Sequence, residues 1–207
     1  MSHTFQLIFL RHGKTDANIN RIFCGQTDLP LTQTGRQLLR EAVAAGVYPH
    51  AERAFTSSML RAVETCAILA PALQPTLLSD LREYHFGDYE GFSHHQLQDR
   101  PDYTAWVNDE TGDVSTPNGE SRVQFMQRTL RGMQQIGDAC AASGTKTALL
   151  VTHGGIIASL LLRWFPGQQT YGQWQPQPGY GYLLQIEYDS KAPADSNIAI
   201  LQRIEPQ

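Results

Sequence analysis

The segment around His12 has the residue types needed for phosphoryl chemistry. Arg11 and His12 follow an apolar run, Phe5 to Leu10, and Gly13 comes next. A neutral imidazole has a free nitrogen lone pair near neutral pH and can attack phosphorus. Its other ring nitrogen needs an acceptor that fixes the tautomer, and the carbonyl of Gly13 is a candidate. His12 is therefore the candidate nucleophile, although taken alone this short motif more often marks a histidine at the end of a buried strand.

Two arginines and a second histidine are candidate ligands for a phosphoryl group. A transferring phosphoryl group spreads negative charge over its equatorial oxygens, so its stabilisation needs fixed donors. Arginine suits this role because its planar fork makes bidentate contacts and stays charged. Arg11 is expected at the end of a strand and Arg61 at a helix start, and His153 precedes Gly154 and Gly155, whose amides can approach an oxyanion. Alone, Arg61 is equally a solvated helix residue and His153 a helix cap.

Glu83 is the candidate general acid and base. Hydrolysis through a phosphohistidine needs a proton for the leaving oxygen and then a base for the attacking water. Asp88 and Glu90 are rival carboxylates in the same segment, residues 81–91, but their glycine neighbours are more typical of a structural loop. The sequence therefore favours Glu83 for proton transfer.

The elements that must position these residues alternate between strands and helices. Strands are predicted at 5–11, 54–56, 76–78 and 147–151, and helices at 32–45, 59–69, 93–99, 102–107, 121–142 and 155–164. Two last strands, 180–188 and 197–204, are predicted at the sheet edge, joined by a turn with Pro and Ser. The alternation favours an α/β fold, a three-layer α/β/α sandwich with a mostly parallel central sheet. Ligands bind outside the carboxyl ends of such strands, so 5–11 and 147–151 are expected to be neighbours despite about 140 residues of separation.

Local signals refine two of these helices. Thr32 is the expected N-cap of the first helix, whose buried face is predicted to contain Leu38, Leu39, Ala42 and Val43. Ser121 and Gln124 have the spacing of a capping box at the start of the longest helix.

Length and composition limit the domain organisation and the class of ligand. The 207 residues, 41% hydrophobic and 17% charged, fit one globular domain over 1–207, and the segment at about 92–118 is interpreted as a small insertion over the active site. A net charge of −4 disfavours nucleic acid, whose binding needs a basic face. No run approaches the roughly 20 apolar residues of a membrane span. Three distant cysteines without metal-ligand spacing favour reduced thiols in a cytoplasmic protein.

Together these segments resemble the histidine phosphatase superfamily, which has the phosphoglycerate-mutase-like fold. The resemblance covers most of the chain in order: Phe9–Gly13, Asn18, Cys24–Thr32, Ser57–Thr65, Leu81–Gly91, Pro117–Ser121 and Val151–Gly155. It implies His12 as the phosphorylated nucleophile, Arg11, Arg61 and His153 as the phosphate pocket, and Glu83 as the proton donor. The expected substrate-binding residues are Thr15, Asn18, Cys24, Gly25, Gln26, Tyr84 and Gly154. Lys14 departs from the pattern, since many members carry Glu or Gln there.

Within this family the sequence favours a phosphatase over a mutase, because a phosphoglycerate mutase must also bind a carboxylate. Tyr84 follows Glu83, His94 is the nearest later candidate cation, and residues 92–118 contain Arg100 but no lysine. The same segment contains Tyr103 and Trp106, which suit an apolar or nucleoside-like leaving group. These aromatic residues, with Phe86–Glu90 and Asn118–Glu120, look like those of α-ribazole-5′-phosphate phosphatases of cobalamin synthesis.

The expected activity is hydrolysis of a small phosphomonoester metabolite through a phosphohistidine. Two alternatives stay open: a phosphoglycerate mutase-type phosphotransferase, and a catalytically idle member that binds phosphorylated ligands. The presence of all five chemical residues argues against the idle member. No metal or organic cofactor is implied, because arginines supply the charge that Mg²⁺ would provide. The expected partner is the substrate rather than a nucleic acid or a membrane, and a homodimer is left open.

Overall fold

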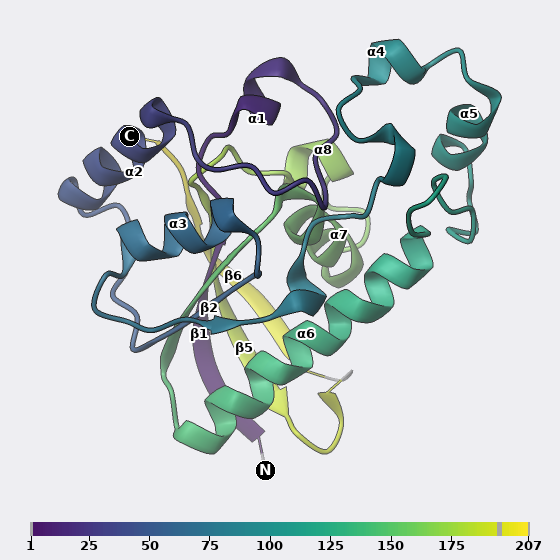
Figure 1. Cartoon of the computed structure of the whole chain (residues 1–207). Helices are drawn as coiled ribbons and strands as arrows, with labels where there is room; N and C mark the ends of the chain where they lie inside the picture. Colours follow the sequence, from purple (N-terminus) through teal and green to yellow (C-terminus); the bar gives the residue numbers. More distant parts are fainter. Residues whose placement is uncertain (1, 194–195, 207) are drawn as a thin grey trace.

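A mixed six-stranded sheet forms the centre of the fold in the computed structural model, which describes residues 2–193 and 196–206 (Figure 1). Its order is β3-β2-β4-β1-β5-β6. The strands are β1 (Ser2–Arg11), β2 (Arg53–Thr56), β3 (Thr76–Leu77), β4 (Thr147–Thr152), β5 (Gly181–Asp189) and β6 (Asn197–Ile204). The first four in spatial order run parallel, and β5 is antiparallel to both of its neighbours. The α/β fold with a mostly parallel sheet is therefore confirmed.

The pairing of β1 with β4 determines where the site forms. The two strands run parallel and in register, and Arg11 lies opposite Thr152. His12 and His153 are the next residues of the two strands, so they leave the sheet side by side at its carboxyl edge. The expected adjacency of these two strands is confirmed.

The prediction that both last strands lie at the edge was wrong for β5. This strand lies between β1 and β6, and only β6 is an edge strand. Buried residues alternate along β5, as they do in a strand with one covered face. This pattern resembles that of an edge strand, because an antiparallel strand inside a sheet can also expose one face. Of the turn predicted between β5 and β6, residues 194–195 lie outside the described residues.

Helices cover both faces of the sheet. The principal ones are α2 (Gln33–Ala44), α3 (Leu60–Leu69), α6 (Arg122–Ser143) and α7 (Gly154–Trp164). On one face, Phe5, Leu7 and Phe9 of β1 pack in a cluster with apolar residues of α6 and α7. On the other, Ile8 and Leu10 pack with buried residues of α3. Alternate β1 residues thus point to opposite layers, as the geometry of a strand requires.

Both predicted caps are present, but the predicted buried face of α2 is only half right. Thr32 Oγ1 accepts a hydrogen bond from the amide of Gly35 at 2.9 Å, and the Ser121 capping box is complete. Along α2, Leu39 and Ala42 are buried, whereas Leu38 and Val43 are 47% and 40% exposed. The helix packs mainly against α3, so only a narrow strip of its surface is covered.

Short elements surround the carboxyl edge of the sheet. They are α1 (Asp16–Asn20), α4 (His94–Leu97), α5 (Pro101–Val107), α8 (Tyr171–Trp174) and the 3-10 turns Ser79–Leu81 and Gly87–Tyr89. The sequence analysis predicted α4 and α5 but not α1 or α8. In Figure 1, α4 and α5 lie at the upper right, next to the N-terminal end of α6. A small aromatic cluster around Tyr89, Leu97 and Tyr103 holds them there.

Three further observations concern membrane spans, metals and thiols. Over 2–193 and 196–206, no helix is long and apolar enough to cross a membrane. The same residues contain no group of three or more His, Cys, Asp or Glu side chains arranged to hold a metal ion. Cys24, Cys66 and Cys140 are free thiols in the described part of the chain.

Candidate active site

A cavity of about 730 Å³ opens at the carboxyl edge of the sheet, where β1 ends. Eight of the twelve predicted catalytic and substrate-binding residues line it: Arg11, His12, Thr15, Asn18, Cys24, Arg61, Glu83 and Tyr84. His153 is fully buried next to His12, with 5.2 Å between the ring centroids. Gly25, Gln26 and Gly154 are not part of the lining.

His12 is held as a neutral imidazole with one nitrogen free. Its Nδ1 lies 2.7 Å from the carbonyl oxygen of Gly13, which can only accept, so Nδ1 donates and the lone pair is on Nε2. The amide of Gly13 in turn donates to Thr65 Oγ1 at 2.9 Å, which fixes this backbone. Burial, and then the charges of Arg61 and Arg11, hold the pKa of His12 well below its ordinary value of 6.5. The ring is therefore suited to nucleophilic attack.

His153 is a neutral donor at the same place. Its Nε2 lies 2.7 Å from Ser57 Oγ, and the Met59 amide donates to the same oxygen at 3.4 Å. We assign the Ser57 hydroxyl as the donor to Nε2, which places the ring proton on Nδ1. Burial, and after it the charge of Arg61, lowers the pKa of His153 well below 6.5. Its buried Nδ1 has no partner among the described residues.

Both arginines are anchored by backbone carbonyls and keep further N–H groups without a partner among the described residues. Arg61 donates to the carbonyls of Thr27 and Gly25 at 2.9 and 2.8 Å, and Arg11 donates to that of Pro176 at 2.9 Å. The buried Nε atoms of both have no partner within the described residues. Burial lowers the pKa of Arg11, and the charge of Glu83 acts in the opposite direction. With His153 Nδ1, these groups form a set of buried donors that an oxyanion can satisfy.

The Glu83 carboxylate is half-buried at the cavity wall and fixed by two backbone amides. Its Oε2 accepts from the Gly155 amide and its Oε1 from the Tyr84 amide, both at 2.9 Å. A Cβ atom at Gly155 would lie 2.2 Å from Glu83 Oε1, so any other residue here would require the carboxylate to shift. The side-chain amide of Gln26 donates to the Glu83 carbonyl at 2.9 Å. Gln26, predicted to bind substrate, is thus outside the cavity lining and holds the backbone of Glu83.

The two rival carboxylates are both used in structural contacts. Glu90 accepts from the amides of Gln26 and Thr27 at 2.6 and 2.7 Å and from the Thr27 hydroxyl. Asp88 accepts from Asn118 Nδ2 at 3.0 Å. Neither carboxylate lines the cavity, which leaves Glu83 as its acidic group.

Besides these charged and polar residues, the cavity has an apolar wall that the sequence analysis mostly missed. Its members are Ile22, Phe23, Phe86, Trp106, Val107, Phe125, Met126 and Leu162. Trp106 had been singled out in the sequence, whereas Tyr103 is buried behind it with its hydroxyl 2.7 Å from His94 Nδ1. Phe23 directly precedes the Cys24–Thr32 motif, which was the available signal for it.

Two cations at this cavity were also missed. Arg21 and Arg122 both line it, as does the predicted His94. Arg122 lies 3.6 Å from Asp109, and Arg100, which the sequence analysis had considered, instead forms a 2.7 Å ion pair with Asp102 away from the cavity. Arg21 caps α1 in the left-handed conformation, φ 52°.

Comparison with known proteins extends this picture. The model of a family described as "Histidine phosphatase superfamily (branch 1)" matches residues 7–197. The chain is 33% identical to "Phosphoglycerate mutase-like protein 4" of Arabidopsis thaliana, over 76% of this chain and 70% of that protein. It is 29% identical to the "Adenosylcobalamin/alpha-ribazole phosphatase" of Salmonella typhimurium, over 76% and 78% of the two chains. The crystal structure of the alpha-ribazole phosphatase from Shigella flexneri has the same fold, with a TM-score of 0.77, 23% identity and 98% of each chain covered.

Proposed function

Because the chain belongs to branch 1 of the histidine phosphatase superfamily, we propose that it is a phosphatase that hydrolyses a small phosphomonoester through a phosphohistidine on His12. The observation that carries this proposal is the neutral His12 ring, which has Nε2 free, lines one cavity with Arg11 and Arg61, and lies 5.2 Å from the His153 ring. A nucleophile, a set of oxyanion donors and a carboxyl group around one cavity are the parts that the reaction needs.

In the first step, His12 Nε2 attacks phosphorus. The N–P bond forms as the bond from phosphorus to the leaving oxygen breaks. Arg11, Arg61 and His153 Nδ1 donate to the phosphoryl oxygens, where negative charge is concentrated. The protonated Glu83 carboxyl gives its proton to the leaving oxygen, so that a neutral alcohol departs.

In the second step, water attacks the phosphohistidine. The Glu83 carboxylate takes a proton from the water as the new P–O bond forms and the N–P bond breaks. Inorganic phosphate is released, His12 returns to its neutral form, and Glu83 is protonated again. The Gly13 carbonyl keeps the same His12 tautomer throughout, because Nδ1 donates to it before and after the transfer.

For the substrate, we propose an aromatic or nucleoside-like alcohol esterified to phosphate, with α-ribazole-5′-phosphate as the first candidate. The apolar wall with Phe23, Phe86 and Trp106 supports a flat leaving group, and the Salmonella relative is named for α-ribazole. We also propose that residues 92–118 are an insertion that completes this wall, since they contribute His94, Trp106 and Val107.

Metal-free hydrolysis of p-nitrophenyl phosphate by wild type, His12→Ala and His95→Ala tests the reaction. His95 is an exposed control outside the cavity. We expect turnover in wild type and His95→Ala, loss of turnover in His12→Ala, and a phosphoryl adduct on His12 after rapid quenching. No turnover by the wild type on any phosphomonoester, α-ribazole-5′-phosphate included, would contradict the proposal.

A mutase-type phosphotransferase is the second candidate, because Arg21 and Arg122 line the cavity and can bind a substrate carboxylate. Its test is the interconversion of 2- and 3-phosphoglycerate in the presence of a bisphosphorylated primer. Interconversion faster than release of inorganic phosphate favours the mutase. Ligand binding with neither reaction favours the catalytically idle member.

A further inference from the structure

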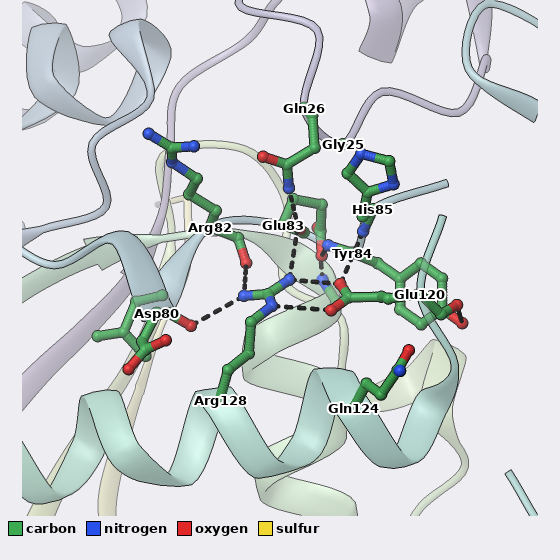
Figure 2. A network of polar contacts seen from close by, with 12 residues as sticks. Gly25, Gln26, Asp80, Arg82, Glu83, Tyr84, His85, Glu120, Gln124 and Arg128 are labelled. Carbon is green, nitrogen blue, oxygen red and sulfur yellow. Dashed lines mark hydrogen bonds and ion pairs between the residues drawn. The ribbon is translucent and has the colours of Figure 1, made fainter. Parts of the chain in front are cut away.

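The loop that carries Glu83 is fastened by an arginine outside the cavity lining. Arg128 lies on α6, and its guanidinium donates five hydrogen bonds (Figure 2). Two go to the Glu120 carboxylate, at 2.9 and 2.6 Å. The other three go to the backbone carbonyls of Asp80, Arg82 and Glu83, at 2.8, 2.7 and 2.8 Å. Every donor of the side chain therefore has a partner, and the side chain is only 14% exposed.

These carbonyls belong to an irregular part of the chain that depends on side chains for its hydrogen bonds. The 3-10 turn Ser79–Leu81 ends here, and no strand among the described residues pairs with residues 82–86. The Leu81 carbonyl accepts from Thr152 Oγ1, at the end of β4, at 2.9 Å. Arg128 holds the carbonyls on either side of it. The loop is thus fixed between α6 and the strand that leads to His153.

The fixed backbone aims the Glu83 carboxyl at the cavity. Arg128 and Gln26 both donate to the Glu83 carbonyl, while the carboxylate on the same residue accepts from the Gly155 amide. Proton transfer requires the carboxyl within hydrogen-bond reach of the leaving oxygen, and a misplacement of about 1 Å can cost ~100-fold in rate. The position of this one backbone segment therefore governs the geometry of the acid.

The same network reaches the apolar wall of the cavity. Besides pairing with Arg128, Glu120 accepts from the His85 amide at 2.8 Å through its carboxylate. Its backbone carbonyl accepts from the Tyr84 hydroxyl at 2.5 Å, and that hydroxyl accepts from Trp106 Nε1 at 3.0 Å. The group that protonates the leaving oxygen and the wall beside the leaving group are therefore joined by one set of contacts.

We propose that Arg128, anchored by Glu120, is the positioning residue for proton transfer by Glu83. It does not touch the substrate, and it acts by holding the backbone from Asp80 to Glu83 in the conformation that presents the carboxyl. This inference rests on the proposed function, in which Glu83 protonates the leaving oxygen. Replacing Arg128 is therefore expected to lower kcat/KM most for substrates whose leaving oxygen must receive a proton in order to depart.

Arg128→Met removes the guanidinium and keeps an unbranched apolar side chain. Arg131→Met is the matched control. Arg131 lies one turn further along α6, is 59% exposed, and its guanidinium pairs with the Asp80 carboxylate at 3.3 Å. The measurement is kcat/KM for a series of aryl and alkyl phosphates, since this ratio reports the step in which the leaving group departs. We expect Arg128→Met to lose ~100-fold on phenyl phosphate and less than ~10-fold on p-nitrophenyl phosphate. Arg131→Met should leave both values unchanged.

The same substitution in a Glu83→Gln background shows whether Arg128 acts through Glu83. A residue that works only by positioning Glu83 has little further effect once the carboxyl is gone, so the two losses on phenyl phosphate should not add. An equal loss in both backgrounds, or an equal loss for all leaving groups, overturns the proposal. If Glu83→Gln alone leaves phenyl phosphate hydrolysis unchanged, the proposed role of Glu83 fails instead, and the two failures are thereby distinguished.

Loss of the fold is checked by thermal unfolding of each variant. Should Arg128→Met not fold, Arg128→Lys and Glu120→Gln take its place, because each retains part of the network. Both are expected to show the same leaving-group dependence to a smaller degree. A uniform loss over all leaving groups in these variants overturns the proposal as well.

Discussion

The carboxylate of Glu83 accepts a hydrogen bond from the backbone amide of Gly155 at 2.9 Å. The two residues come from different parts of the fold, one from the loop after a 3-10 turn and the other from the first turn of α7. The amides at the start of a helix favour an anion. The candidate acid and the histidine at the N-cap of α7 are thus placed by the same helix terminus.

Gly155→Ala is expected to displace the Glu83 carboxylate while the fold is kept. A Cβ at this position would lie 2.2 Å from Glu83 Oε1, so the carboxylate must move by a substantial part of an ångström. We expect kcat/KM for phenyl phosphate to fall by ~100-fold. Gly172→Ala on α8 is the control, because nothing lies within 4 Å of its added Cβ. Wild-type kinetics in Gly155→Ala would show that the position of this carboxylate is not critical.

Ser57→Ala is expected to lower activity without removing any group that touches phosphate. In the assigned arrangement the Ser57 hydroxyl donates to His153 Nε2, so the ring proton is on Nδ1. Without it, part of the population would present a lone pair to the oxyanion, and kcat/KM should fall by about tenfold, the equivalent of one hydrogen bond. Ser58→Ala is the neighbouring control, since Ser58 Oγ contacts Arg82 and not a histidine. Equal effects of the two substitutions would argue against this role of Ser57.

Trp106→Ala is expected to lower kcat/KM more for aromatic phosphates than for small ones. The indole lines the cavity and donates to the Tyr84 hydroxyl at 3.0 Å. We expect kcat/KM for naphthyl phosphate to fall ~10- to 100-fold through loss of apolar contact, and that for glycerol phosphate to change much less. Trp106→Phe keeps a ring in the wall and should retain most of the discrimination. A similar loss on both substrates would mean that the wall does not receive the leaving group.

The buried histidine pair makes a specific contribution to the pH dependence of stability. In the folded protein the pKa values of His12 and His153 lie well below 6.5, so both rings stay neutral there. In the unfolded chain each binds a proton as the pH falls through its ordinary value, so the free energy of unfolding decreases below pH 6.5. The slope approaches about 1.4 kcal/mol per pH unit for each histidine and continues down to the pKa of the folded state.

Denaturant unfolding between pH 7.5 and 5 measures this contribution. His153→Gln should reduce the slope below pH 6.5 by about 1.4 kcal/mol per pH unit. The exposed His50→Gln serves as the control and should leave the slope as in wild type. Identical slopes in wild type and His153→Gln would contradict the lowered pKa of His153.

The sequence predicted the site best where residues with catalytic side chains directly follow a predicted strand. Arg11 and His12 after one apolar run, and His153 after another, are enough to predict two parallel neighbours with their histidines together. Helix caps such as Thr32 and Ser121 were also predictable, because a capping side chain acts within three residues of its own position.

The supporting contacts were not predictable, because their acceptors are backbone atoms. Arg128 and Gln26 donate to backbone carbonyls of a distant loop. Every residue type has such a carbonyl, so the sequence does not indicate which ones accept these hydrogen bonds. For the same reason Glu90, which binds backbone amides, looked like a rival acid. The apolar wall was missed because Phe23, Phe125 and Leu162 come from three separate segments, and an aromatic or aliphatic residue read singly indicates only a core.

The place of β1 in the sheet also affects how the chain must be made. Within residues 1–207, β1 is synthesised before β4 and β5, the two strands with which it pairs. The apolar run Phe5 to Leu10 is therefore without its β4 partner until Thr147–Thr152 has been synthesised. Such long-range pairing slows folding and leaves a nascent chain open to aggregation. We expect that ribosome-bound chains ending before β4 have no phosphatase activity and depend on chaperones that cover this strand.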